Sequence, residues 1–154
     1  MNRFAHVGMT TRVIGGHWVW SPRMQQMARD NEIEAYVLPG GVIMQLMREV
    51  AAGRPGLITH VGLGTFVDPR LDGGRMNEAA KQTLTEIITI DGRDYLRYLP
   101  IPVTVALLRG SYADEDGNIS LEEEPANLDI YAIAAAAHNS GCLLYTSPSP
   151  RDIS

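Results

Sequence analysis

Residues 56–70 of the chain read Gly56-Leu-Ile-Thr-His-Val-Gly-Leu-Gly-Thr-Phe-Val-Asp-Pro-Arg70. The first part is apolar, with β-favouring residues such as Leu57 and Val61, so it predicts a strand that leads into a glycine-rich loop. Gly62 and Gly64 have no Cβ atom, which lets backbone N–H groups approach a substrate oxygen or a phosphate. In an open α/β sheet, ligands bind at the carboxyl ends of the strands, where we expect this loop. A tight structural turn is the alternative interpretation of the spacing.

The composition is that of an ordinary globular protein. The 154 residues suffice for one domain with a modest core, and the hydrophobic (45%) and charged (20%) shares are typical. The net charge of −5 argues against nucleic acid as a partner. The single cysteine, Cys142, gives no disulfide framework and fits a reducing cytoplasm, which is the predicted location. No apolar run approaches the ~20 residues of a membrane-spanning helix, so no membrane association is expected.

A strand–helix–strand unit is predicted near the start of the chain. Residues 11–14 and 33–38 have the character of short strands. Between them a serine N-cap followed by Pro22 starts a helix that ends near residue 31. Such a unit implies a right-handed parallel crossover.

A second helix is predicted over residues 42–52, because apolar side chains recur there every three or four positions. Its positive end, at Gly40 and Gly41, is expected at the carboxyl edge of a strand, where it suits an anion. Earlier in the chain, His17, Trp18 and Trp20 follow the first strand. They either line a cleft or pack as aromatic surface, and packing is the favoured interpretation.

The rest of the chain predicts a hairpin, a further strand, a turn and a helix. Residues 86–98 alternate in polarity around a central Asp-Gly pair, which indicates a β-hairpin. The apolar run 103–108 is typical of a strand covered on both faces. The acidic turn at 113–118 lacks the ligand spacing of a calcium loop, and the histidines lack metal-ligand spacing, so no metal site is predicted. A helix is expected over residues 125–138.

Several separate stretches, in one order, carry a resemblance to a known family. They are Val61-Gly-Leu-Gly-Thr-Phe-Val-Asp-Pro-Arg70 followed by Gly73-Gly74, and NRFAH (2–6), RVIGGH (12–17), IEAY (33–36), AAGRPG (51–56), ITIDG (88–92), ADEDGNIS (113–120) and NSG (139–141). Together they resemble the first half of the family I CoA-transferases of the propionate/acetate type. Several matches in one order are far more specific than any single one.

The resemblance implies a fold and an activity. The fold is an α/β domain with an open, mainly parallel sheet, helices on both faces and an inserted β-hairpin, similar to the Rossmann-like alpha domain of these enzymes. Residues 1–141 are expected to form an incomplete domain of this kind. The activity is transfer of coenzyme A between a short-chain acyl-CoA and a carboxylic acid, as in acetate, propionate or 3-keto acid metabolism. Coenzyme A is then a substrate, no cofactor is expected, and the intact enzyme is expected to be a homo-oligomer.

The same resemblance identifies substrate-binding residues. They are Gly62, Gly64, Thr65 and Phe66 in the loop, which lines the acyl-CoA cleft, with Gly40 and Gly41. The family often has glutamine where Gly40 stands, and glycine cannot supply that side-chain contact. CoA transfer needs a carboxylate nucleophile and backbone donors for the oxyanion. The resembled enzymes take a glutamate from their second half, so no catalytic residue is assigned in this chain.

Two other functions remain open. One is a non-catalytic acyl-CoA-binding or regulatory half-domain. The other is a phosphosugar isomerase of related fold, which would need an acid–base pair beside a phosphate loop and finds little support with Lys81 as the one lysine. The expected partners are an acyl-CoA, a small carboxylic acid and the second half of the same protein. Residues 142–154 resemble translated sequencing-adapter read-through and are expected to be a non-native, disordered tail, because repeated Ser-Pro prevents helix and interior strand.

Overall fold

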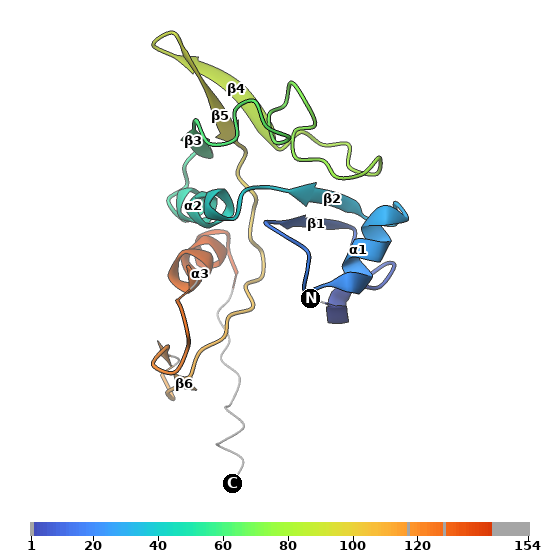
Figure 1. The fold of residues 1–154 in the computed structure, drawn as a ribbon. Coiled ribbons are helices and arrows are strands. Elements are labelled where there is room, and N and C mark those ends of the chain that lie inside the picture. Colours follow the sequence, from blue (N-terminus) through green and yellow to red (C-terminus); the bar gives the residue numbers. More distant parts are fainter. Residues whose placement is uncertain (1, 117, 128, 143–154) are drawn as a thin grey trace.

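The computed structural model describes residues 2–116, 118–127 and 129–142. The elements are η1 (Asn2–Phe4), β1 (Arg12–Gly15), α1 (Pro22–Arg29), β2 (Glu34–Val37), α2 (Gly40–Ala51), β3 (Leu57–Thr59), β4 (Thr85–Ile90), β5 (Arg93–Tyr98), β6 (Tyr112–Ala113), β7 (Ile119–Ser120) and α3 (Ile130–Asn139). Figure 1 shows α2 and α3 side by side, with the strands β3, β4 and β5 above them and β1, β2 and α1 to their right. Except for Cys142, the predicted tail lies outside the described residues.

The strand–helix–strand unit predicted at the start of the chain is present. β1 and β2 pair in parallel, with Val13 opposite Ala35. α1 begins at Pro22 and buries Met24 and Met27 in one cluster with Ala35, against which Val13 packs. The methionines of α1 therefore fill the core on one side of this strand pair, as expected for flexible apolar side chains.

A larger core connects α2 to the strands that follow it. Leu46 of α2 is fully buried, in one cluster with Leu57 of β3 and with Leu96 and Tyr98 of β5. Ala132 of α3 belongs to the same cluster, and α3 packs against α2. Burial of this apolar stripe stabilises the fold by roughly 25 cal/mol for each Å² removed from water.

The predicted hairpin is confirmed, but the described strands do not form one mainly parallel sheet. The hairpin β4–β5 forms around Asp91 and Gly92, but β3 joins it as an antiparallel strand, in the order β3–β5–β4. Leu57 lies opposite Tyr98 in this pairing. Among the described residues only β1 and β2 pair in parallel. The free edge of β5 offers β3 a nearby ladder of hydrogen bonds, which the apolar pattern of β3 could not reveal.

Two predictions for the later part of the chain are also wrong. The run 103–108 is not a strand: Val105 is 68% and Leu107 77% exposed, and no described strand pairs with this segment. Apolar character alone cannot make a strand where no partner supplies hydrogen bonds. The last helix begins at Ile130, about one turn later than its predicted start, because Asp129 before it has a left-handed conformation (φ 56°).

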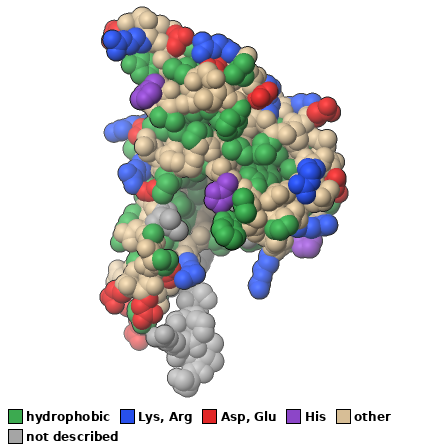
Figure 2. Space-filling model, in the orientation of Figure 1, with side chains coloured by type: hydrophobic (Ala, Val, Ile, Leu, Met, Phe, Trp, Pro, Cys, Tyr) green, Lys and Arg blue, Asp and Glu red, His purple; other side chains and the backbone are tan. Residues whose placement is uncertain are grey.

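The surface combines charged edges with apolar areas. Figure 2 shows hydrophobic side chains over the middle of one face, with basic and acidic side chains toward its edges. Large apolar side chains that are at least 44% exposed include Val61 and Phe66 of the loop after β3 and Trp20 before α1. Within the described ranges, no helix is both long and apolar enough to cross a membrane.

Candidate functional site

The candidate site is built on the glycine loop, which we define as residues 60–74. Gly62 has a φ of +100° and Gly64 a φ of +70°, conformations that glycine adopts at little cost. At Gly62 there is also a steric requirement, because an added Cβ atom would lie 2.5 Å from Tyr98 Oη and 2.5 Å from Val67 Cγ2. At Gly64 the added atom would meet nothing within 4 Å. Packing therefore requires glycine at position 62, whereas only backbone conformation favours it at position 64.

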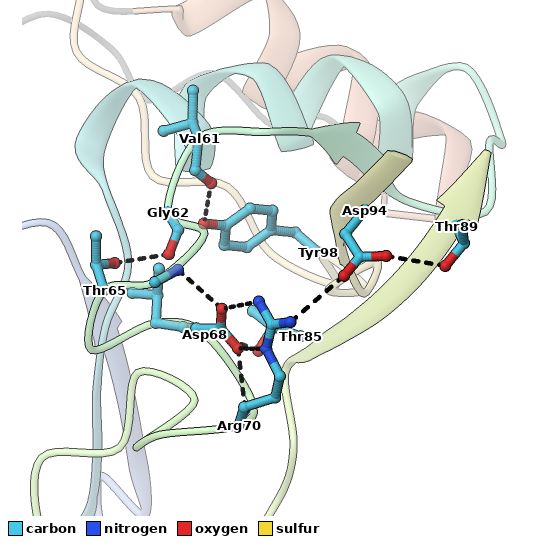
Figure 3. Close-up of polar contacts among 11 residues, drawn as sticks. Val61, Gly62, Thr65, Asp68, Arg70, Thr85, Thr89, Asp94 and Tyr98 are labelled. Atoms are coloured by element: carbon cyan, nitrogen blue, oxygen red, sulfur yellow. Dashed lines mark hydrogen bonds and ion pairs between the residues drawn. The ribbon is translucent and has the colours of Figure 1, made fainter. Parts of the chain in front are cut away.

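Asp68 lies in the middle of this loop with 1% of its surface exposed. Its Oδ2 accepts hydrogen bonds from the Gly64 N–H (2.8 Å) and from Arg70 Nη2 (2.7 Å). Its Oδ1 accepts from the N–H (3.0 Å) and the Nε (2.9 Å) of Arg70. Figure 3 shows the carboxylate between the loop backbone and the guanidinium. Asp68 precedes Pro69, a pair that favours turns, and the turn forms, but the Asp68 side chain also connects two parts of the loop.

The negative charge of Asp68 is paired with the positive charge of Arg70. Hydrogen bonds from the Arg70 side chain and from the Gly64 N–H hold the pKa of Asp68 below its usual range, and the same contact raises the pKa of Arg70. Arg70 Nη1 also lies 3.4 Å from a carboxylate oxygen of Asp94 in β5. Asp94 in turn accepts a hydrogen bond from Thr89 of β4. The buried carboxylate is therefore ionised at neutral pH, and its partner arginine connects it to the hairpin.

The loop already uses part of its own backbone donors. The N–H of Leu63 donates to His60, that of Thr65 to Gly62, and that of Gly64 to the Asp68 carboxylate. Among the described residues, no acceptor faces the N–H of Gly62 or of Phe66. A substrate oxygen could therefore be bound by Gly62 and Phe66 without breaking an internal hydrogen bond, whereas binding to the Gly64 N–H would compete with Asp68.

Two further side chains hold the loop from outside. The Tyr98 hydroxyl donates to the Val61 carbonyl (2.9 Å), and the buried Thr85 hydroxyl donates to the Val67 carbonyl (3.0 Å). Burial raises the pKa of Tyr98 to about 12. The Thr65 hydroxyl donates back to Gly62 (2.8 Å) while Thr65 itself stays exposed. The loop is thus fixed at its start, Val61, by strand β5 and near its middle, Val67, by strand β4.

Gly40 and Gly41 form the first turn of α2, which begins two residues earlier than the predicted helix over residues 42–52. The backbone of Gly40 is close to that of Gly16, since a Cβ atom added at Gly16 would lie 3.2 Å from Gly40 Cα. The glycine loop reaches the same strand end through Gly74, whose carbonyl accepts a hydrogen bond from Val37 N–H (2.8 Å). Gly40 and Gly41 therefore follow the carboxyl end of β2, and the glycine loop reaches the same end through Gly74, whose N–H donates to the Phe66 carbonyl.

Three residues that shape this region have no role predicted from the sequence: Tyr98, Thr85 and Asn77. Tyr98 falls within the predicted hairpin (residues 86–98) and Thr85 lies just before it, and no local pattern indicates that either side chain reaches a loop. Asn77 makes four hydrogen bonds, to backbone groups of Ala28, Ile33, Ala35 and Ala80. It ties the end of α1 to β2, and a lone asparagine in a loop gives no signal of such a role.

A cavity of about 630 Å³ lies near the carboxyl end of β1. Its lining includes His17, Trp18, Arg29, Met76 and Glu78, and it contains none of the predicted site residues. His17 and Trp18 therefore lie beside a cavity, and Trp18 also packs against the core cluster around α1, so for Trp18 the favoured packing interpretation holds as well. Elsewhere in the described part of the chain, no cluster of three or more His, Cys, Asp or Glu side chains is arranged to hold a metal ion.

Comparison with known proteins identifies the family. The sequence profile described as "Coenzyme A transferase" matches residues 3–141. The chain is 46% identical over 141 residues to a caffeate CoA-transferase of Acetobacterium woodii, and 41% identical over 137 residues to the acetate CoA-transferase YdiF of Escherichia coli K12. These matches cover 92% and 89% of this chain. The chain belongs to the coenzyme A transferase family, as the motifs predicted.

The solved structures agree with this assignment. The fold superposes with a TM-score of 0.89, at 39% identity and over 92% of this chain, on the acyl-CoA transferase YdiF of E. coli O157:H7, solved as a thioester complex with CoA. The match covers 29% of that chain. In the same way, the chain spans 27% and 26% of the lengths of the two curated relatives.

Proposed function

We propose that this chain is the first part of an enzyme that transfers coenzyme A between a short-chain acyl-CoA and a carboxylic acid, and that it supplies cleft walls. The glycine loop carries the proposal: Gly62 is confined by Tyr98 and Val67, in a fold that matches an acyl-CoA transferase solved with CoA. The proposed substrate-binding residues are Gly62, Gly64, Thr65 and Phe66, with Gly40 and Gly41. Gly62 and Phe66 are the stronger members, because their N–H groups have no acceptor within the described part of the chain.

The reaction needs a carboxylate nucleophile, and we propose that a glutamate outside this chain provides it. The carboxylate attacks the acyl-CoA carbonyl, so that the C–S bond breaks and an acyl-glutamyl anhydride and CoA thiolate form. The thiolate then attacks the glutamyl carbonyl, which releases the first acid and leaves a glutamyl-CoA thioester. The acceptor acid then attacks the glutamyl-CoA thioester and releases the thiolate, which attacks the new anhydride. A new acyl-CoA forms and the glutamate is regenerated. Each attack creates an oxyanion that backbone N–H groups can stabilise.

The acidic residues in this chain give little support to a nucleophile of its own. Glu123 accepts a hydrogen bond from Tyr112, and Glu124 pairs with Arg109 at 3.0 Å. Asp68 is held by Arg70 and Gly64 and is buried, so its carboxylate is not presented to a substrate. For the whole protein we also propose a larger, open and mainly parallel, Rossmann-like sheet, a cytoplasmic location and a homo-oligomer. The parallel β1–β2 pair supports the first of these.

The test is a graft into a related enzyme. Residues 3–141 replace the aligned segment of E. coli YdiF, and CoA transfer from acetyl-CoA to a second carboxylic acid is measured. We expect the grafted enzyme to be active and the 154-residue chain alone to be inactive. An inactive but folded graft would contradict the proposed function, and transferase activity of the isolated chain would contradict the external nucleophile. If the chain binds acyl-CoA but the graft does not catalyse CoA transfer, a non-catalytic binding domain would be favoured.

A further inference from the structure

The Asp68 carboxylate accepts more hydrogen bonds than a turn requires. For turn formation an asparagine side chain would serve as well, because one oxygen is enough to accept from the Arg70 N–H. The structure uses both oxygens: Oδ1 accepts from Arg70 alone, whereas Oδ2 joins Arg70 to the Gly64 N–H. A buried charge is tolerated only when it is paired and hydrogen-bonded, and here four donors meet this need.

The contact to Gly64 decides which backbone donors of the loop remain available. It engages the Gly64 N–H at 2.8 Å, while the neighbouring N–H groups of Gly62 and Phe66 have no acceptor in the described residues. It also restrains Gly64, which is exposed and whose added Cβ atom would meet nothing within 4 Å, so that packing alone does not hold it. Tyr98 holds the loop at Val61 and Thr85 holds it at Val67. Without the carboxylate, the segment between these two points would lose its central anchor.

We propose that Asp68 is a positioning residue for acyl-CoA: it holds the loop through Gly64 so that the Gly62 and Phe66 N–H groups are presented to substrate oxygens. Arg70 acts on Asp68 and not on the substrate, by fixing the orientation of the carboxylate and connecting it to Asp94 on the hairpin. This inference rests on the proposed function, because it assigns a substrate to the donors of the glycine loop.

The test replaces Asp68 with asparagine, which has nearly the same shape but one acceptor oxygen. Its single oxygen can accept either from the Gly64 N–H and Arg70 Nη2 or from the N–H and Nε of Arg70, so two of the four donors lose their acceptor and the remaining hydrogen bonds lose the charge. In the 154-residue chain, the Gly64 amide proton is expected to exchange faster in Asp68→Asn than in the wild type, as followed by NMR. In the YdiF graft, the KM for acyl-CoA is expected to rise roughly tenfold, the effect of losing one hydrogen bond of the charge-assisted kind.

Two control variants separate positioning from stability and charge. Asp72→Asn makes the same charge change at an exposed position of the same loop, and should leave the KM for acyl-CoA unchanged. Tyr36→Phe removes a buried hydroxyl that bonds to Gln82 away from the loop. It should lower stability and the yield of active enzyme, but not raise the KM, because a loss of folded molecules lowers only the maximal rate. Arg70→Gln changes a half-exposed side chain and should give a smaller rise in KM than Asp68→Asn.

Each outcome decides between the two proposals. An active graft in which Asp68→Asn leaves the KM for acyl-CoA unchanged would overturn the positioning role and leave the proposed function standing. An inactive wild-type graft would overturn the proposed function, and the positioning role with it. If Asp68→Asn does not fold, Arg70→Gln decides, because an unchanged KM in that variant would equally overturn the inference.

Discussion

Gly62 offers the sharpest test of the loop structure. In Gly62→Ala, the new methyl group would lie 2.5 Å from Tyr98 Oη, 2.5 Å from Val67 Cγ2 and 3.0 Å from Leu96 Cδ1. Tyr98 and Leu96 are buried core residues of β5, so they cannot move aside freely. The φ of +100° adds backbone strain for any residue with a side chain. We therefore expect both a steric and a conformational cost.

The size of the effect follows from these two terms. Overpacking a close-packed site costs about 2 kcal/mol, and the backbone strain about 1 kcal/mol. Gly62→Ala should thus lower the free energy of unfolding by about 3 kcal/mol, a large part of the stability of a small domain. Gly64→Ala is the matched control, since it has a φ of +70° but an added Cβ atom meets nothing within 4 Å. It should cost only the strain, about 1 kcal/mol.

The assay is urea unfolding of the 154-residue chain, followed by circular dichroism. A third variant, Gly62→Ala combined with Tyr98→Phe, removes the hydroxyl from the crowded site and should recover about 1 kcal/mol relative to the sum of the single changes. Equal destabilisation by Gly62→Ala and Gly64→Ala would refute the reasoning, because it would mean that nothing near Gly62 resists a methyl group.

Three further predictions concern pH and the connections between elements. The pKa of Asp68 is lower in the folded chain than in the unfolded one, so the stability that its ionised form provides is complete above about pH 5 and is lost as pH falls below about 4. In Asp68→Asn, the free energy of unfolding measured with urea should therefore fall less steeply at acid pH than in the wild type. An unchanged fall would argue against the buried ion pair. The pKa of Tyr98 is raised to about 12 in the folded chain, so as pH rises the unfolded chain loses the phenol proton first. The free energy of unfolding should therefore fall between about pH 10 and 12, and it should fall less in Tyr98→Phe. Asn77→Ala leaves backbone groups of α1 and β2 without their partner and should lower the free energy of unfolding by about 3 kcal/mol. Asn118→Ala, at an exposed turn, should lower it by about 1 kcal/mol or less. Similar thermal unfolding of the two variants would contradict the role of Asn77 in connecting α1 to β2.

Much of the local structure was predictable from the sequence. The β1–α1–β2 unit, the start of α2 at the paired glycines and the hairpin around Asp91 and Gly92 each depend on neighbours in the chain. Caps, turn residues and the period of apolar side chains report on such neighbours directly. The family, too, was readable from ordered motifs, since it depends on residue identity and spacing and not on contacts.

The tertiary structure decided what depends on residues far apart in sequence. The pairing of β3 with β5 and the exposure of Val105 and Leu107 follow from which strand edge is available, and an apolar run carries no such information. The sequence placed Asp68 in a turn, but only the fold shows that its carboxylate takes up the Gly64 N–H and is paired with Arg70. The reach of Tyr98 to the Val61 carbonyl likewise needs the antiparallel pairing of β3 and β5, which brings residue 98 opposite residue 57. The sequence by itself therefore determined the family and the glycine loop, and the three-dimensional packing determined which of the loop's N–H groups are left for a ligand.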